Sequence, residues 1–259
     1  RLYSSLIILF LAIGINPLSS DIYYILKKNI LTSDAPIPKN ISSIQLNNFN
    51  VKSSGRNIIF IYLESLEATY MNSKIFPNLT PNISKYFKNS LAFDNIKQTY
   101  GDGWTIAGMV SSQCGIPLLG HASNTMSDID LFLPGVECLG DILKLNGYHL
   151  EYYGGASLDF AGKGKFLKQH GFEKVYGKEK LINKVKNKKY ISNWGLYDDT
   201  LYELVIDRFE KLINNKKLFG LFALTLDTHH PTGYLSKSCD NIKYLDGSNP
   251  ILNAVHCSD

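Results

Sequence analysis

Short, continuous apolar runs alternate with stretches of helical periodicity over most of the chain after residue 56. The run 57–63 (NIIFIYL) is β-rich, and a second strongly apolar run follows at 218–226 (LFGLFALTL). A run like the first is typical of a strand covered on both faces, so we expect 57–63 to be buried on both sides. A further strand is predicted at 148–154 (YHLEYYG).

Helical patterns separate these strands, at about 80–89, 105–113, 138–146 and 199–214. The last is amphipathic, and Asp198 or Asp199 is its expected N-cap. Strands that alternate with helices predict an α/β fold with a mostly parallel central sheet flanked by helices. Ligands bind beyond the carboxyl ends of the strands in such sheets. The residues there are polar or glycine: Glu64, Ser65, Tyr153, Gly154, Asp227, His229 and His230.

The first 20 residues differ in character from the rest. An unbroken apolar run extends from Leu6 to Ile15, shorter than the roughly 20 residues that span a bilayer. With its flanks, 1–20 is predicted to be a membrane-spanning or membrane-proximal segment, with Arg1 on the cytoplasmic side. A signal peptide is the alternative, but no small-residue cleavage site stands out. Residues 21–56 are a predicted juxtamembrane linker, and 57–259 form the predicted domain.

Composition adds size and charge to this picture. A chain of 259 residues with 44% hydrophobic content can build one large core. The net charge of +4 is too small to predict a nucleic-acid partner. Basic residues are concentrated in KEKLINKVKNKK at 178–189. This stretch is either a solvated helix face or a surface attracted to anionic lipid.

The four cysteines contain no C-x-x-C pair. An even number beside a predicted membrane segment suggests disulfides in an oxidising compartment, with free buried thiols as the alternative. Pairing by neighbourhood is one of three possible connectivities. It would join Cys114 to Cys138 and Cys239 to Cys257.

Glu64 and Thr105 are the first candidates for chemistry. Glu64 follows the first predicted strand, where a carboxylate can ligate a metal, act as a base or cap the next helix. Thr105 follows a Gly-Asp-Gly-Trp turn and begins a predicted helix, so an ordinary N-cap is the competing interpretation. A helix N-terminus also binds phosphate, and a hydroxyl there becomes a nucleophile once a metal or base activates it.

The segment LDTHHP places Asp227, His229 and His230 after the second long strand. Histidine can ligate a metal or give a proton to a leaving oxygen, and a surface histidine pair is the alternative. Other chemistries lack their signatures, since neither G-x-S-x-G nor a P-loop is present. Cys114-Gly-Ile-Pro117 approaches the sulfatase pattern C-x-P-x-R, but its proline is one position late and no arginine follows.

Seven stretches together resemble a known family. They are NIIFIYLESLEATY, FPNLTPNI, TIAGMVSSQCGIPL, CLGDILKLNGY, FAGKGKFLKQHGF, NWGLYDDT and LFALTLDTHHPTGY. From about Asn57 to Asp259 the chain resembles the periplasmic domain of the phosphoglycerol transferase I family, which modifies osmoregulated periplasmic glucans. That family is more distantly similar to lipoteichoic acid synthase and to sulfatases of the alkaline phosphatase superfamily. The resemblance implies a sulfatase-like fold, and this subfamily also has cysteines at the four positions.

The resemblance implies specific roles. Thr105 would be the nucleophile, and Glu64 with Thr105 would ligate a divalent cation, Mn²⁺ or Mg²⁺. His229 would bind substrate and supply a proton, and His230, Lys163 and Trp194 are further substrate-binding candidates. The implied reaction moves phosphoglycerol from phosphatidylglycerol to a periplasmic glucan through a phosphoglyceryl-threonine. It implies the bacterial inner membrane as the location, with the catalytic domain in the periplasm.

One departure from the family pattern concerns the metal. In the family an Asp-His pair after a later strand completes the site, and no such strand precedes Asp259. We therefore expect this chain to be the N-terminal portion of the domain, truncated on its C-terminal side and inactive alone. A phosphoethanolamine transferase, a sulfatase-family hydrolase and a non-catalytic glycan-binding relative are the alternatives.

Overall fold

The computed structural model describes residues 55–98, 103–118 and 130–259. The predicted membrane segment 1–20 and the linker 21–56, apart from its last two residues, lie outside the described residues. Within the described ranges, no helix has the length and apolar character needed to cross a membrane.

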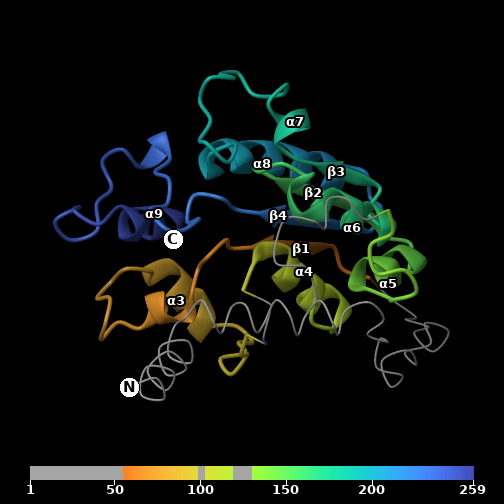
Figure 1. Ribbon diagram of the computed structural model, residues 1–259, viewed down its shortest axis with the longest axis horizontal. Coiled ribbons are helices and arrows are strands. Elements are labelled where there is room, and N and C mark those ends of the chain that lie inside the picture. Colours follow the sequence, from red (N-terminus) through yellow and green to blue (C-terminus); the bar gives the residue numbers. More distant parts are fainter. Residues whose placement is uncertain (1–54, 99–102, 119–129) are drawn as a thin grey trace, which may run out of the picture.

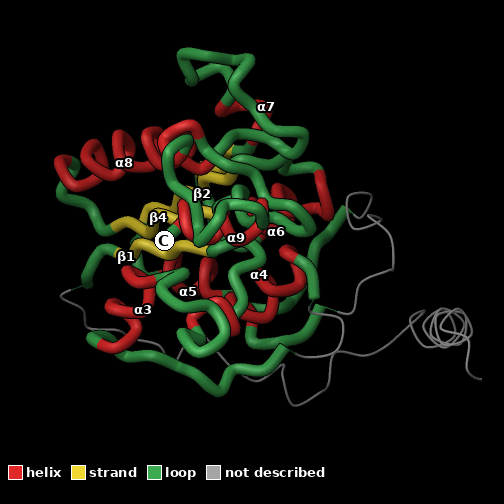
Figure 2. Tube along the Cα trace, turned by 90° about the vertical axis from the view of Figure 1, so that its left-hand side faces the viewer, coloured by secondary structure: helices red, strands yellow, loops and turns green. Residues whose placement is uncertain are grey.

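The described residues form one sheet of four parallel strands, in the order β1-β4-β2-β3 (Figures 1 and 2). The strands are β1 (Ile58–Tyr62), β2 (His149–Gly154), β3 (Lys174–Tyr176) and β4 (Phe219–Leu224). This confirms the predicted parallel sheet and three of its strands. The pattern did not predict β3, because three residues are too few to show a period.

Each predicted helix is present, with ends within one or two residues of the prediction: α3 (Pro81–Lys88), α4 (Thr105–Cys114), α5 (Leu139–Leu145) and α8 (Asp198–Asn214). The described residues form three further helices that were not predicted: α6 (Lys163–Gln169), α7 (Lys178–Leu181) and α9 (Pro250–Ser258). The described residues also contain three 3₁₀ turns: η2 (Ala68–Met71), η4 (Phe160–Gly162) and η5 (Lys237–Cys239).

Helices cover both faces of the sheet (Figure 1). On one face α4, α5 and α6 pack against strand residues such as Leu150 and Phe222 in the larger core cluster. On the other face α8 and the end of α7 pack against Tyr153, Leu221 and Ala223. A smaller cluster around Leu79 joins the segment before α3 to α9. The result is the layered α/β architecture that the alternating pattern predicts.

The expectation that β1 is buried on both faces is wrong. Ile59 is 50% exposed and Ile61 is 46% exposed, whereas every residue of β4 is buried. The reason is position, since β1 lies at the edge of the sheet that the described residues form, while α8 packs on β2 and β4. A continuous apolar run does not distinguish an edge strand from a central one.

The expected N-cap of α8 is also wrong. The N-cap is Tyr197, and Asp198 and Asp199 lie in the first turn of the helix. The Asp198 carboxylate instead accepts hydrogen bonds from the backbone N–H groups of Leu226, at 2.6 Å, and Asp227, at 3.0 Å. Buried backbone donors at a strand end need such a partner, and this one ties α8 to the end of β4.

Both expected disulfides are present. Cys114–Cys138 joins the end of α4 to the start of α5, with 4.1 Å between the Cα atoms. Cys239–Cys257 joins η5 to α9, with 5.8 Å between the Cα atoms. No cysteine of the described residues is free. Of the three possible connectivities, the structure has the pairing between neighbouring cysteines.

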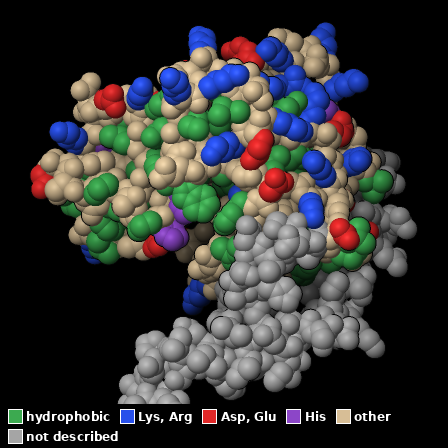
Figure 3. Space-filling model, turned by 45° about the horizontal axis from the view of Figure 1, so that its top comes forward, with side chains coloured by type: hydrophobic (Ala, Val, Ile, Leu, Met, Phe, Trp, Pro, Cys, Tyr) green, Lys and Arg blue, Asp and Glu red, His purple; other side chains and the backbone are tan. Residues whose placement is uncertain are grey.

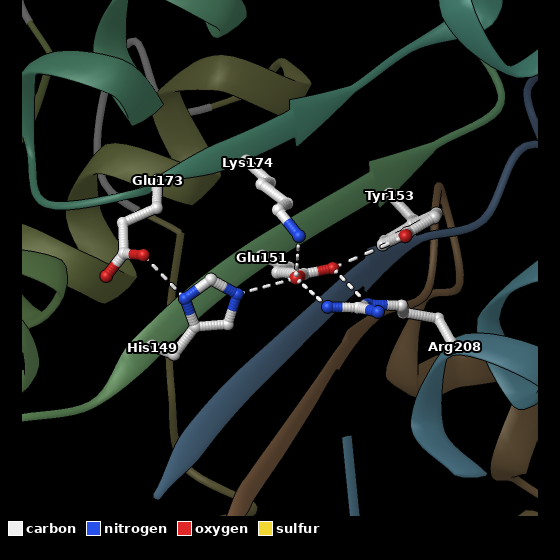
Figure 4. Close-up of polar contacts among 6 residues, drawn as sticks. All are labelled: His149, Glu151, Tyr153, Glu173, Lys174 and Arg208. Carbon is white, nitrogen blue, oxygen red and sulfur yellow. Dashed lines mark hydrogen bonds and ion pairs between the residues drawn. The ribbon is translucent and has the colours of Figure 1, made fainter. Parts of the chain in front are cut away.

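A buried carboxylate links β2 to β3 and α8 (Figure 4). Glu151 has a fully buried side chain and receives two hydrogen bonds from Arg208 of α8, at 2.6 and 2.8 Å. His149 contacts it at 2.6 Å and Lys174 of β3 at 3.2 Å. Burial by itself raises the pKa of Glu151, but the hydrogen bonds from Arg208 and His149 outweigh it and lower that pKa to about 2. No local sequence pattern predicts this network, because Arg208 lies 57 residues from Glu151 in the chain.

Candidate active site

Thr105 is the first helical residue of α4, and it does not cap the helix. The N-cap is Trp104, whose backbone is extended and whose side chain makes no capping bond. The first-turn N–H groups of α4 therefore keep their capacity to bind an anion. The Thr105 hydroxyl points elsewhere, to the carboxylate of Glu64, at 3.0 Å from Oε2 and 3.2 Å from Oε1. The capping interpretation of Thr105 is thereby excluded.

Glu64 follows β1, and its carboxylate is held between two hydroxyls. The Ser65 hydroxyl donates to Glu64 Oε1 at 3.2 Å, and the same carboxylate accepts the hydrogen bond from the Thr105 hydroxyl. Ser65 has a φ of 51°, the left-handed conformation that a non-glycine residue rarely adopts. The chain thus turns sharply after β1, and a carboxylate faces a helix N-terminus. This arrangement places a proton acceptor within hydrogen-bond distance of a hydroxyl.

Two buried threonines after β4 fix the backbone of Glu64. The Glu64 N–H donates to the Thr225 hydroxyl at 2.9 Å, and the Thr228 hydroxyl donates to the Glu64 carbonyl oxygen. Thr225 is 3% exposed and Thr228 is 1% exposed. The backbone N–H and carbonyl groups of Glu64 are therefore both hydrogen-bonded by side chains that follow β4. Neither threonine was predicted as a site residue, although Thr228 lies within the segment LDTHHP and Thr225 directly precedes it.

A group of rings lies beyond the end of β4. The rings of His229 and Trp194 are 4.5 Å apart between centroids, and His230 stacks on His229 at 5.2 Å. Phe160 meets Trp194 edge to face at 5.2 Å. Trp194 reaches this place because Gly155 and Gly195 let two backbone segments approach closely, where an added Cβ at Gly195 would lie 1.9 Å from the Gly155 oxygen.

The His229 ring has a defined orientation. Its Nδ1 lies 2.8 Å from the carbonyl oxygen of His230. Because a carbonyl oxygen only accepts hydrogen bonds, Nδ1 carries the hydrogen. Nε2 is then the nitrogen left for a ligand or for proton transfer. His229 is half-buried and His230 is exposed, so His229 is the better placed of the two for chemistry.

Lys163 connects the ring group to Glu64. Lys163 is the first residue of α6. Its side chain is almost fully buried, and its Nζ lies 5.2 Å from the centroid of the Phe160 ring. Burial lowers the pKa of Lys163, while the charges of Glu64 and Glu179 act in the opposite direction. Lys163 thus supplies a desolvated cation within electrostatic reach of Glu64. Such a cation suits an anionic phosphoryl group.

Asp227 and Asp198 form an acidic pair next to His229. Burial raises the pKa of Asp227, and the charge of neighbouring Asp198 raises it further. The Ser236 hydroxyl donates to Asp227 Oδ2, while Oδ1 is buried and has no hydrogen-bond partner among the described residues. Asp227 therefore faces the loop interior beside Ser236. It is a structural group of the loop, and it lies apart from the contacts of Thr105.

The predicted metal ligands fit a hard divalent cation in their chemistry. Glu64 and Thr105 offer oxygen atoms, which Mg²⁺ and Mn²⁺ prefer. Across the described residues, no group of three or more carboxylate, histidine or cysteine ligands includes Glu64. The chain therefore brings together two of the ligands that such a site needs.

One other cluster has suitable ligand types, but two of its three members have every ligand atom engaged. Cys138, Asp141 and His170 lie close together, but Cys138 is in a disulfide. His170 contacts the Asp141 carboxylate at 2.8 Å through Nδ1 and the Phe132 carbonyl oxygen at 3.0 Å through Nε2. Burial lowers the pKa of His170, but these two acceptors outweigh burial and raise it. The cluster is thus an internal hydrogen-bond network.

Comparison with known proteins identifies the family. Residues 56–248 match the family model described as Sulfatase. This chain belongs to the sulfatase family. Its solved neighbours share the fold of the family, at identities too low to show more than that. A protein of the alkaline phosphatase superfamily from Vibrio parahaemolyticus has a TM-score of 0.56 at 22% identity, covering 78% of this chain and 48% of that one. The lipoteichoic acid synthase LtaP from Listeria monocytogenes has a TM-score of 0.60 at 16% identity, covering 85% of this chain and 54% of that one.

The curated relatives of this sulfatase-family chain are more similar to it in sequence. Phosphoglycerol transferase I of Escherichia coli O6:K15:H31 is 45% identical over 205 residues, which is 78% of this chain and 27% of that protein. The same figures hold for the protein of that name from Shigella boydii serotype 18. The chain thus spans about a quarter of the length of these relatives. The resemblance found in the sequence and the predicted fold class are both confirmed.

The structure brings most of the predicted site residues together. Glu64 contacts Thr105, and His229 contacts Trp194, at the carboxyl ends of β1 and β4. Lys163 joins the two groups through Phe160 and the charge of Glu64. His230 lies at the exposed margin. The catalytic, metal-binding and substrate-binding roles of these residues remain predictions.

Proposed function

We propose that this chain is part of a membrane-anchored phosphoglycerol transferase. In this reaction Thr105 takes phosphoglycerol from phosphatidylglycerol and passes it to a periplasmic glucan. The observation that carries the proposal is the Thr105 hydroxyl, held 3.0 Å from the Glu64 carboxylate at the N-terminus of α4. The 45% identity to phosphoglycerol transferase I supports this donor group over the phosphoethanolamine of related transferases. The absent C-x-P-x-R pattern disfavours sulfate ester hydrolysis.

In the first step the Thr105 oxygen forms a bond to phosphorus and the phosphorus–oxygen bond to diacylglycerol breaks. Glu64 holds the Thr105 hydroxyl in position and takes its proton as the bond to phosphorus forms. The free N–H groups of α4 and the Lys163 ammonium stabilise the phosphoryl oxygens. His229, with a proton on Nε2 as well as on Nδ1, gives the Nε2 proton to the leaving diacylglycerol oxygen.

In the second step a glucan hydroxyl forms a bond to phosphorus and gives its proton to His229 Nε2, and the bond from phosphorus to Thr105 breaks. The Thr105 oxygen takes back the proton held by Glu64, and the product is a phosphoglycerol-substituted glucan. A divalent cation, Mn²⁺ or Mg²⁺, held by Glu64 and Thr105 would neutralise phosphoryl charge and favour the deprotonated threonine. Further ligands in the longer protein would complete such a site.

The proposed location follows the same argument. Two disulfides are typical of a protein outside the cytoplasm, which supports a periplasmic domain. A membrane anchor in 1–20 would hold the domain near a lipid donor and raise the effective donor concentration. We therefore place the enzyme at the bacterial inner membrane, with its catalytic domain in the periplasm.

The test is the covalent intermediate. The complete natural protein is incubated with Mn²⁺ and phosphatidylglycerol without acceptor, and its peptides are analysed by mass spectrometry. We expect a glycerophosphate adduct on the peptide that contains Thr105, released when glucan is added. Thr105→Ala is the control that must lose it. Thr105→Ser keeps a hydroxyl at the same place and should retain a measurable adduct.

Other outcomes identify the alternatives. An adduct that forms only with phosphatidylethanolamine would identify a phosphoethanolamine transferase. No adduct with either lipid, in a folded and metal-loaded protein, would refute the nucleophile and favour a non-catalytic glycan-binding relative. Glu64→Gln keeps the size of the side chain but removes its charge. It should lower both adduct formation and metal affinity measured by calorimetry.

A further inference from the structure

The stretch 178–189 carries a concentrated positive charge. It holds six lysines and one glutamate, a net charge of +5, which exceeds the +4 of the whole chain. Lys180, Lys184, Lys186, Lys188 and Lys189 are exposed, and Lys178 is half-buried. Lys and Arg side chains gather on the top of the molecule, the side of α7 (Figure 3). We refer to the six lysines, together with Lys237, as the basic strip.

The charge of the basic strip is not neutralised by the described residues. None of its lysines has a carboxylate of these residues within ion-pair distance, whereas Lys174, Arg208 and Lys211 each have one. The one acid within 178–189, Glu179, makes its side-chain hydrogen bond to Ser157, outside the strip, and interacts with Lys178 only beyond ion-pair distance. Burial raises the pKa of Glu179, but a hydrogen bond with Ser157, backbone hydrogen bonds and the charge of Lys178 together outweigh burial and lower that pKa. The strip therefore presents an unpaired positive field.

The strip is also held in a fixed place on the domain. Leu181 at the end of α7 is fully buried in the core cluster under α8, and Val185 packs against the same cluster. The ammonium groups of Lys180 and Lys184 lie 5.7 and 4.2 Å from the centroid of the Tyr176 ring. A flexible tail would not offer its charges at a defined position on the surface, and this segment does.

The strip reaches the margin of the candidate active site. Its last element is Lys237, whose ammonium lies 4.7 Å from the Tyr190 ring. The backbone N–H of Lys237 donates to the Tyr190 hydroxyl at 2.6 Å, which joins the two ends of the strip. Four residues after Tyr190 the chain reaches Trp194, the ring stacked near His229. Ser236, the neighbour of Lys237, donates to Asp227 in the loop that carries His229, so this end of the strip lies beside that loop.

We propose that the basic strip is a docking surface for an anionic lipid bilayer, which orients the active site toward the membrane. This rests on the proposed function, since the lipid donor is itself an anionic phospholipid. Exposed lysines each gain about 1 kcal/mol near such a surface, which is about fivefold in binding for each lysine. A bilayer offers many phosphates in one plane, and a strip of seven lysines along one side of a domain matches that geometry.

The test measures how close the strip comes to lipid in the complete natural protein, reconstituted in vesicles through its own membrane segment. A fluorophore is attached at Asn183→Cys on the strip, or at Ser90→Cys after α3 as the distant control. The native cysteines of the described residues are in disulfides and leave the new one for labelling. Energy transfer to a labelled lipid is compared between neutral vesicles and vesicles with about 30% phosphatidylglycerol.

We expect strong transfer from position 183 only in the anionic vesicles, and its loss in about 0.5 M salt. Replacing Lys186, Lys188 and Lys189 with Gln should lower the ratio of docked to undocked protein at least about tenfold. The same change at three exposed lysines elsewhere, Lys85, Lys88 and Lys97, is the charge-matched control and should leave it unchanged. Transfer that is equal at both labels, or independent of lipid charge, would overturn the proposal.

Two further arms separate this proposal from the proposed function. The strip variant should form the Thr105 adduct normally when the donor is supplied in neutral detergent micelles. Thr105→Ala should lose the adduct and still dock. If a soluble acidic glucan binds the strip while anionic vesicles do not, the partner is the glucan and the lipid proposal is refuted.

Discussion

Glu151→Gln is expected to weaken the fold most strongly at neutral pH. The substitution keeps the shape of the side chain but removes the charge that Arg208, Lys174 and His149 surround. Arg208 would then lie against a neutral amide with its main counter-ion gone. Leaving one partner of a buried pair alone typically costs about 3–5 kcal/mol, more than an exposed pair contributes.

The pKa of Glu151 gives the magnitude and the sign. Its lowering from 4.5 to about 2 corresponds to about 3 kcal/mol of stability at neutral pH. We reduce this to about 2 kcal/mol, because the Lys174 side chain is 43% exposed and solvent screens its charge. A lowered folded pKa stabilises the protein above the unfolded value. That stability is lost as the pH falls from about 5 toward about 2.

Urea unfolding at several pH values tests this reasoning. At neutral pH we expect Glu151→Gln to lower the unfolding free energy by about 2–4 kcal/mol, and the difference should shrink below about pH 4. Asp207→Asn is the matched control, because it removes an exposed helix pair with Lys211 and should cost less than about 0.5 kcal/mol. A loss for Glu151→Gln that is no larger than the control, or that is constant from pH 7 to pH 3, would refute the reasoning.

Three further predictions concern the site and its surroundings. Thr228→Val should lower adduct formation on Thr105 by about tenfold or more, because the Glu64 carbonyl oxygen loses its hydrogen-bond donor. Thr228→Ser keeps the hydroxyl and should restore adduct formation, and equal losses in both variants would contradict a positioning role for Thr228. Asp227→Asn should raise the free energy of unfolding at alkaline pH, because the raised pKa of Asp227 in the folded state makes the wild type lose stability as this carboxyl ionises. Thermal unfolding over a range of pH measures this, and an equal pH dependence in both proteins would contradict it. His170→Asn should destabilise most below about pH 6.5, because the raised pKa of His170 gives stability that is lost as pH rises through the folded value; chemical unfolding at acidic and alkaline pH measures the difference.

The sequence predicts the fold well where patterns are local and long. Continuous runs and helical periods located three strands and four helices, because each spans enough residues to show a period. The same patterns could not show that β1 is an edge strand, since exposure of Ile59 and Ile61 depends on where α8 lies. Nor could they show that Asp198 binds the end of β4, a partner 28 residues away.

The site was predictable to the extent that function requires special residue types. A threonine after a glycine turn and a carboxylate at a strand end were recognisable, and their motif resemblance to a family supported them. Thr225 and Thr228 were not recognisable, because a buried threonine has no signature that separates positioning from packing. Their role depends on the parallel pairing of β1 with β4, which places Tyr62 opposite Leu224.

This pairing explains how an edge strand can carry a group that must be accurately placed. β1 has the helix α4 on one face and partly exposed apolar residues on the other, so packing alone fixes it less firmly than β4. Past the last ladder pair, hydroxyls from the neighbouring strand hold both backbone groups of Glu64. Its carboxylate is thereby positioned by β4, the most buried strand of the described sheet, rather than by β1 alone. The proposed nucleophile, Thr105, is held by that carboxylate, so the geometry of the proposed reaction depends on the contact between these two strand ends.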